Sequence, residues 1–273
     1  MAALKLLPIW STMTIYSSIS DSFHGSSKPH LFLDFDGTIS KIDVIDALLE
    51  KFADPRWLDI EKEWVEGKIG SRECLKRQFA FVNATPQQLV DVIDTMEIDD
   101  GFRSLLKVSR DNSLPIHIVS DGFEEYIRRM LARHLGDSSE LAGITIAANS
   151  LFYLGGNWWD TAFRYPEEVC ENGCATCKPA VIRLHTPVSS TPIFVGDGLS
   201  DRFAASYAGV VFAKSKLAGF CRERSIEFTP FDNLEQVADC LREMCESTTP
   251  QFTVQRDGSR IYTAFPAECC PNT

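Results

Sequence analysis

The stretch that decides the fold is Leu31-Phe32-Leu33-Asp34-Phe35-Asp36-Gly37-Thr38. Its first three residues form a short apolar run, as expected of a buried parallel strand, and Gly37 and Thr38 break it. Alternation along an extended chain points Asp34 and Asp36 to one side, at the carboxyl end of the strand, where open α/β sheets bind ligands. Two carboxylates buried there need a cation, and we expect magnesium, which takes oxygen ligands and accompanies phosphate. A calcium loop, the alternative for Asp-x-Asp-Gly, would need a glutamate where the chain has Ile45.

The composition is that of an ordinary globular chain. The 273 residues are 44% hydrophobic and 24% charged, and the formal net charge of -11 argues against nucleic acid as a partner. No run approaches the ~18 consecutive apolar residues of a spanning helix, so no membrane partner is expected. The nine cysteines do not form the framework of a small, loop-rich secreted domain, which favours a cytoplasmic location.

Hydrophobic periodicity predicts a helical insertion directly after the first strand. Apolar residues at three- and four-residue spacing predict helices over residues 39–52, 57–66, 71–82 and 86–96. Thr85 is the expected N-cap of the last of these, with Pro86 at its first position. Such a stretch is too long for a simple crossover between strands and is interpreted as a lid.

The remainder alternates strands and helices, which predicts an α/β fold with a doubly wound parallel sheet. Strands are expected over residues 114–119, 192–195 and 210–213, helices over 123–135, 179–184 and 199–207, and a β-hairpin over 144–159. The expected organisation is a catalytic core of residues 29–40 and 107–245, a small helical cap of residues 41–106, and irregular termini over 1–28 and 246–273.

Three further polar clusters follow the predicted strands. Ser120 closes the second strand and precedes Asp121-Gly122, Lys178 starts a short helix, and Asp197 and Asp201 lie in Gly196-Asp197-Gly198-Leu199-Ser200-Asp201. If these strands are neighbours in one sheet, the clusters converge at one edge.

The order of these motifs resembles the haloacid dehalogenase superfamily of phosphohydrolases, over about residues 29–240. The family pattern is Asp-x-Asp-x-Thr, then Ser or Thr after a strand, then Lys, then Gly-Asp-Gly-x-x-Asp, and all four motifs are present in order.

The resemblance implies a role for each motif residue. Asp34 would be the nucleophile and Asp36 the general acid and base. Magnesium would be held by Asp34, the backbone carbonyl of Asp36 and Asp197, with Asp201 steadying its shell. Phosphate would be bound by Ser120, by backbone N–H groups near Gly37 and Gly122, and by Lys178.

The insertion resembles the cap of the phosphoserine-phosphatase-like branch. Members of that branch place an acidic residue nine positions after the nucleophile, here Asp43, and an arginine on the cap helix, where this chain has Gln78. The chain is closer to the methionine-salvage 2-hydroxy-3-keto-5-methylthiopentenyl-1-phosphate phosphatases, which share the Asp-Phe-Asp-Gly-Thr-Ile opening, the cap glutamine and a cysteine cluster before the lysine. That cluster, Cys170-x3-Cys174-x2-Cys177, would need a fourth ligand to hold zinc.

The resulting hypothesis is a magnesium-dependent phosphomonoesterase acting on a small phosphorylated metabolite, as a monomer or a homodimer. Three alternatives remain open: a phosphatase of a larger terpenoid or polyketide phosphate, a dehalogenase on the same scaffold, and a non-catalytic regulatory protein with this fold. Dehalogenation needs no metal, which would leave Asp36 and Asp197 without a function.

Overall fold

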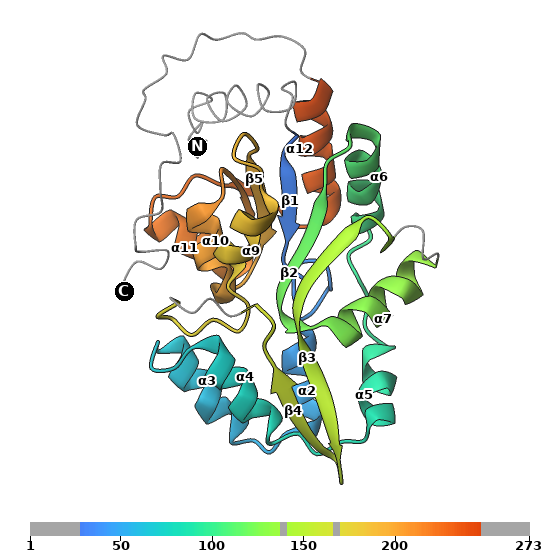
Figure 1. Cartoon of the computed structure of the whole chain (residues 1–273), viewed down its shortest axis with the longest axis vertical. Coiled ribbons are helices and arrows are strands. Elements are labelled where there is room, and N and C mark those ends of the chain that lie inside the picture. Colours follow the sequence, from blue (N-terminus) through green and yellow to red (C-terminus); the bar gives the residue numbers. More distant parts are fainter. Residues whose placement is uncertain (1–27, 137–140, 166–169, 247–273) are drawn as a thin grey trace, which may run out of the picture.

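A computed structural model describes residues 28–136, 141–165 and 170–246. The terminal segments expected to be irregular lie almost entirely outside these ranges. Within them, one sheet has the strand order β4-β3-β2-β1-β5-β6-β7, flanked by helices on both faces (Figure 1). None of the helices in these ranges combines the length and apolar character that a membrane crossing requires.

The sheet is parallel except at one edge, where β4 runs antiparallel to β3. Its strands are β1 (His30–Leu33), β2 (Ile116–Phe123), β3 (Ile144–Gly155), β4 (Trp158–Ala162), β5 (Pro192–Gly196), β6 (Val210–Ala213) and β7 (Thr229–Pro230). The predicted doubly wound α/β fold is confirmed. Because β1 lies between β2 and β5, the residues after all three strands emerge side by side at the carboxyl edge.

Helices bury the sheet on both faces, and successive residues of a strand enter different apolar clusters because they point to opposite sides. Leu31 and Leu33 belong to an apolar cluster covered by α6, α7 and α12, whereas Phe32 belongs to a second cluster covered by α9, α10 and α11 (Figure 1). These helices are α6 (Phe102–Asn112), α7 (Glu124–Leu135), α9 (Lys178–His185), α10 (Arg202–Tyr207), α11 (Ser215–Glu223) and α12 (Leu234–Glu246).

Four helices follow β1, as the periodicity predicts: α2 (Val44–Phe52), α3 (Trp57–Val65), α4 (Ser71–Phe79) and α5 (Pro86–Ile93). The first starts at Val44 rather than at the expected Ile39. The chain first makes a tight turn, in which the amides of residues 38–40 all donate to the Phe35 carbonyl, and Asp43 then caps the helix.

The predicted start of α5 is confirmed. The Thr85 side chain accepts from the backbone N–H of Gln88, and the Gln88 side chain accepts from the backbone N–H of Thr85, which completes a capping box. Pro86 occupies the first helical position, where no intrahelical donor is needed.

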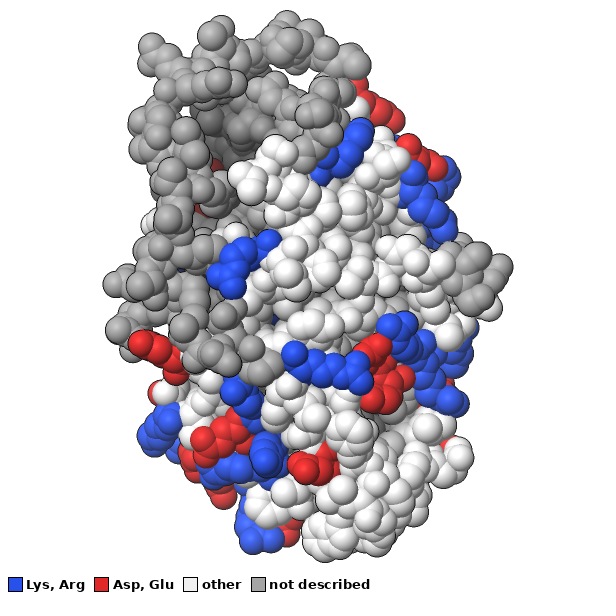
Figure 2. Space-filling model, viewed as in Figure 1, with Lys and Arg blue, Asp and Glu red and all other residues white. Residues whose placement is uncertain are grey.

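The predicted β3–β4 hairpin is confirmed. The insertion after β1 was expected to consist of helices alone, but the hairpin also packs against it. The far end of the hairpin lies beside α4 (Figure 1), and Trp159 Nε1 donates to the Ala84 carbonyl at 2.8 Å. One apolar cluster therefore continues from the sheet into the helices after β1. The hairpin tip exposes Phe152, Leu154 and Trp158, and in Figure 2 the lower right of the molecule is mostly white, whereas charged side chains gather at the lower left.

The expected cap boundary at residue 106 falls inside α6, which is continuous. This helix packs along α12 against the sheet. Because one apolar cluster joins α6 to both the sheet and the helices after β1, the division into core and cap stays a prediction.

Candidate active site

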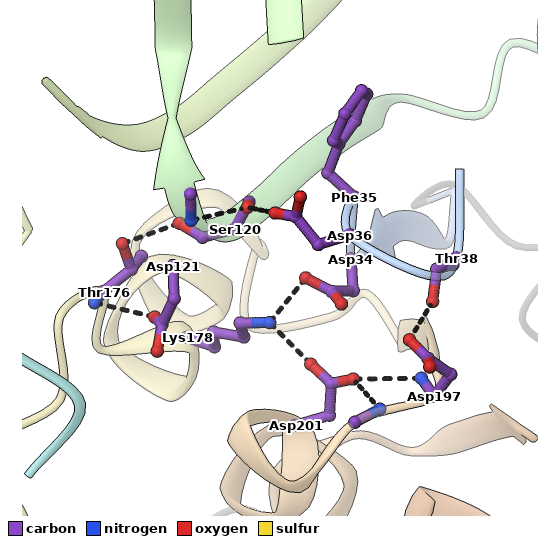
Figure 3. Close-up of polar contacts among 12 residues, drawn as sticks. Asp34, Phe35, Asp36, Thr38, Ser120, Asp121, Thr176, Lys178, Asp197 and Asp201 are labelled. Carbon is purple, nitrogen blue, oxygen red and sulfur yellow. Dashed lines mark hydrogen bonds and ion pairs between the residues drawn. The ribbon is translucent and has the colours of Figure 1, made fainter. Parts of the chain in front are cut away.

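The predicted polar clusters converge at the carboxyl edge of the sheet, as Figure 3 shows. Asp34 follows β1, Ser120 lies within β2, Asp197 follows β5, and Lys178 begins α9. The sheet order makes this convergence possible because β2 and β5 both neighbour β1.

Asp34 and Lys178 form a buried ion pair at the centre of the site. The Lys178 Nζ lies 2.7 Å from Asp34 Oδ1 and 2.5 Å from Asp201 Oδ1, and the lysine is 1% exposed. Burial alone would lower the pKa of Lys178, but the carboxylates of Asp201 and Asp34 outweigh it and raise that pKa. Burial and the charge of Asp201 raise the pKa of Asp34, against the opposing effect of Lys178.

Asp34, Asp197 and Asp201 form the group most suited to a metal ion among the residues the structure describes. One carboxylate oxygen from each lies within 4.8 Å of the others. The Asp201 Oδ2 accepts from the N–H groups of Asp197 and Gly198, and Thr38 Oγ1 donates to Asp197 Oδ1 at 3.0 Å. Three carboxylates beside one lysine leave negative charge uncompensated, and an all-oxygen donor set fits magnesium.

The Asp36 carboxylate faces away from this group, toward β2 and α7. Its Oδ2 accepts from Ser120 Oγ at 3.0 Å and Tyr126 OH at 3.0 Å, and its Oδ1 from the Val44 N–H at 3.1 Å. Burial, followed by the charge of Asp43, raises the pKa of Asp36 to about 7, although these hydrogen bonds oppose the rise. A carboxyl group of that pKa is suited to donate and accept protons near neutral pH.

Ser120 and Gly122 both lie near the carboxyl end of β2, and their polar groups are hydrogen-bonded to each other. The Ser120 hydroxyl accepts from the Gly122 N–H at 2.8 Å while it donates to Asp36. Thr176 Oγ1 donates to the Ser120 carbonyl at 2.8 Å and so secures the end of the strand. In this arrangement both groups expected at the phosphate are engaged with each other.

Sequence reasoning missed two residues of the site, Tyr126 and Asp121. Tyr126 lies in the first turn of α7, four residues after Gly122 and inside the helix predicted over residues 123–135. Asp121 directly follows Ser120, and its side chain accepts from the Thr176 N–H at 2.9 Å and from Ser71 at the start of α4. The signal for both was their closeness in sequence to Ser120.

A cavity of about 660 Å³ opens between Asp34 and the helices after β1. Both predicted specificity residues, Asp43 and Gln78, line it. Gln78 is 2% exposed and donates through Nε2 to Glu61 Oε2 at 2.9 Å. Arg77, one step away on α4, turns instead to Glu63, with the Nη1 of Arg77 2.7 Å from Glu63 Oε2. The cavity therefore presents the amide of Gln78, as the sequence indicates, at the position where the phosphoserine-phosphatase-like branch has an arginine.

Two further carboxylates line the same cavity and were not predicted. Asp46 follows Asp43 by three residues on α2, and Glu61 lies on α3 opposite Gln78. Enclosure, followed by the charge of Asp46, raises the pKa of Asp43 to about 7. Enclosure, followed by the charge of Glu61, raises the pKa of Asp46 to about 6.

The cysteines before Lys178 do not form a metal-binding group within the described ranges. Cys177 is buried and precedes α9 directly; Cys74 and Cys221 are also buried, whereas Cys240 and Cys245 on α12 are only partly buried.

Residues 31–206 match the model of the haloacid dehalogenase-like hydrolases, and the chain belongs to this family. Similar curated proteins are the 2-hydroxy-3-keto-5-methylthiopentenyl-1-phosphate phosphatases of Bacillus cereus (strain 03BB102) and Bacillus thuringiensis (strain Al Hakam). Each is 28% identical over 218 residues, which cover 79% of this chain and 97% of the relative. The predicted family and hydrolase class are confirmed.

Solved structures support the fold. A phosphoserine phosphatase with an analogue of its phospho-aspartyl intermediate has a TM-score of 0.59 at 19% identity, covering 79% of this chain and 99% of that one. A haloacid dehalogenase family hydrolase from Salmonella enterica serovar Typhi has a TM-score of 0.60 at 20% identity, covering 81% of this chain and 73% of that one.

Proposed function

We propose that this hydrolase is a magnesium-dependent phosphomonoesterase that works through an aspartyl-phosphate intermediate on Asp34. The observation that carries the proposal is that two neighbouring carboxylates, Asp34 and Asp36, have different contacts. Asp34 is held by Lys178 within a group of acidic oxygens, whereas Asp36 lies apart, hydrogen-bonded to Ser120 and Tyr126. This difference supports a nucleophilic role for Asp34 and an acid–base role for Asp36.

In the first step, a carboxylate oxygen of Asp34 forms a bond to phosphorus as the bond to the ester oxygen breaks. The leaving oxygen takes a proton from Asp36, whose pKa of about 7 allows it to be protonated at neutral pH. In the second step, water attacks phosphorus and Asp36 takes its proton. The bond between phosphorus and Asp34 breaks, which restores the free carboxylate and releases inorganic phosphate.

Magnesium would be held by the side chains of Asp34 and Asp197 and the backbone carbonyl of Asp36, with Asp201 orienting this set through Lys178 and the backbone N–H groups after β5. When bound, it would neutralise the repulsion between the nucleophile and the phosphate oxygens. Lys178 contributes a second positive charge on the same carboxylate.

We further propose that Ser120, the Gly122 N–H and Lys178 bind the phosphate. The Ser120 hydroxyl can rotate from Asp36 to a phosphate oxygen, since a hydroxyl has one donor and two acceptor sites. The Gly122 N–H, now on Ser120 Oγ, would then be available to the same phosphate.

The substrate we propose is a small phosphorylated metabolite of the cytosol. A cavity of about 660 Å³ suits a compact ester, and the relatives at 28% identity are named for one such substrate. The cap would consist of α2–α5 with the far end of the β3–β4 hairpin, and the core of the remaining sheet with all of α6.

The test is Asp34→Asn, assayed against a panel of phosphorylated metabolites and p-nitrophenyl phosphate. The amide keeps the size of the side chain but lacks the nucleophilic oxygen, so turnover should fall to background while the thermal unfolding transition remains cooperative. Asp239→Asn, at an exposed position on α12, is the matched control and should keep full activity. Phosphatase activity above background in pure Asp34→Asn protein would refute the proposed nucleophile.

A further inference from the structure

Among the residues that the structure describes, Tyr126 is the one tyrosine whose hydroxyl bonds a carboxylate proposed to be catalytic. Its oxygen lies 3.1 Å from Asp36 Oδ1 and 3.0 Å from Asp36 Oδ2, so its single proton is shared between both carboxylate oxygens. The side chain is 3% exposed. We propose that Tyr126 is a positioning residue for Asp36, an inference that rests on the acid–base role proposed for that carboxylate.

The tyrosine ring is held on two sides. It packs edge-on against Phe123, with ring centroids 6.0 Å apart, and tilted against Phe35, with centroids 6.1 Å apart. Phe35 lies between the two catalytic carboxylates in sequence, so the same packing fixes the backbone that carries both of them. A buried ring with little freedom aims its hydroxyl at one place.

Gly122 provides the space for this hydroxyl. A Cβ at residue 122 would lie 1.8 Å from the Tyr126 hydroxyl oxygen and 2.6 Å from Asp36 Oδ2. Any larger residue would therefore displace either the hydroxyl or the carboxylate. The contact between Tyr126 and Asp36 therefore requires a glycine at residue 122. This requirement is separate from the phosphate role proposed for the Gly122 N–H.

The contact matters because Ser120 has two proposed tasks. In the structure Ser120 Oγ donates to Asp36, but binding phosphate would require the same proton. When Ser120 turns to the phosphate, Asp36 loses one of its donors and keeps the Tyr126 hydroxyl and the Val44 N–H. The tyrosine thus holds the general acid in place at the moment the serine is withdrawn.

The experiment compares Tyr126→Phe with Tyr153→Phe on an alkyl phosphate that the wild-type enzyme hydrolyses. Tyr126→Phe removes the hydroxyl and keeps the ring packing. Tyr153→Phe removes a hydroxyl that bonds the Asn157 N–H on the distant hairpin, and it is the matched control. We expect Tyr126→Phe to lower kcat by about tenfold, with KM and the inhibition constant of inorganic phosphate within about twofold of wild type, because only the proton transfer is affected.

A second variant tests the coupling to Gly122. Gly122→Ala should lower kcat more in the wild-type background than in Tyr126→Phe, where the nearest clashing atom is absent. Unchanged kcat in Tyr126→Phe, or an equal fall in Tyr153→Phe, would overturn the positioning role. Absence of any esterase activity in the wild-type protein would instead contradict the proposed function.

Discussion

At the scale of single residues, two polar side chains from different helices line one cavity above Asp34. Asp43 is the N-cap of α2, where its Oδ1 accepts from the Asp46 N–H at 3.0 Å, and Gln78 lies on α4. Neither belongs to the group of carboxylates around Lys178. Their position suits contacts with the part of a substrate that leaves, which is where specificity is decided.

We therefore predict that Asp43→Ala and Gln78→Ala act on the choice of substrate. Each should lower kcat/KM on the best metabolite by about tenfold, or ~1.4 kcal/mol, per lost polar contact. Hydrolysis of p-nitrophenyl phosphate should change much less, because its aryl group does not use those contacts. Gln87→Ala, on the exposed side of α5, is the control. Equal losses on both substrates would place Asp43 and Gln78 in the catalytic machinery.

At the scale of elements, three histidines join β1, β2 and α9 at the ends away from the site. His30 Nδ1 lies 3.0 Å from His117 Nε2, and the His117 ring packs on His185 with centroids 4.8 Å apart. Burial, followed by the charges of His185 and His30, lowers the pKa of His117 to about 3. The sequence alone indicates no partner for His117 or His185, because these contacts exist only when β1, β2 and α9 pack together.

This cluster should make the fold sensitive to acid. A histidine whose pKa is lowered on folding stays neutral in the native state while the unfolded chain takes up a proton below about pH 6.5. The contribution to stability is complete above that pH and is lost as the pH falls toward 3, by at most about 1.4 kcal/mol per pH unit for each such proton.

The measurement is the free energy of unfolding in urea at pH 7.5, 6 and 5. His117→Phe, which keeps an aromatic ring in the stack with Phe32, should lose less stability between pH 7.5 and pH 5 than wild type. His134→Gln, outside the cluster, should behave as wild type. If His117→Phe lost as much unfolding free energy between pH 7.5 and pH 5 as the wild type, the acid sensitivity would arise elsewhere.

At the scale of the whole molecule, the acidic group exists only in the folded chain. Asp34 and Asp197 come from strands far apart in sequence, and their carboxylates meet because β1 pairs with β5. An ion held by this group would bind the native state and not the unfolded chain. Its binding would then stabilise the fold by mass action, about 2.7 kcal/mol at a concentration of 100 times Kd.

We therefore predict that magnesium raises the Tm of the wild-type protein, measured by calorimetry against potassium chloride of equal ionic strength. Asp197→Asn should abolish the rise, whereas the surface variant Asp239→Asn should retain it. An equal rise in Asp197→Asn would remove this residue from the proposed metal site. Full hydrolytic activity after exhaustive chelation would favour the dehalogenase alternative.

The local features of this fold were predictable from the sequence because their causes are local. The apolar run before Asp34 predicts a buried strand, and Thr85 before Pro86 predicts a helix start, since both depend on a few adjacent residues. The order of the polar motifs predicts one shared site in a parallel sheet, and Lys178 and Asp34 are indeed in contact.

What only the tertiary structure decided are the contacts between segments distant in sequence. Periodicity does not specify how elements pack. It therefore could not predict the hydrogen bond from Tyr126 to Asp36, the packing of α6 along α12 or the hairpin beside α4. The sequence by itself determined the strands from β1 to β6, the N-cap of α5 and the set of chemical groups, but not the short edge strand β7. The partners of those groups follow from three-dimensional packing, because burial and charge act through space, not along the chain.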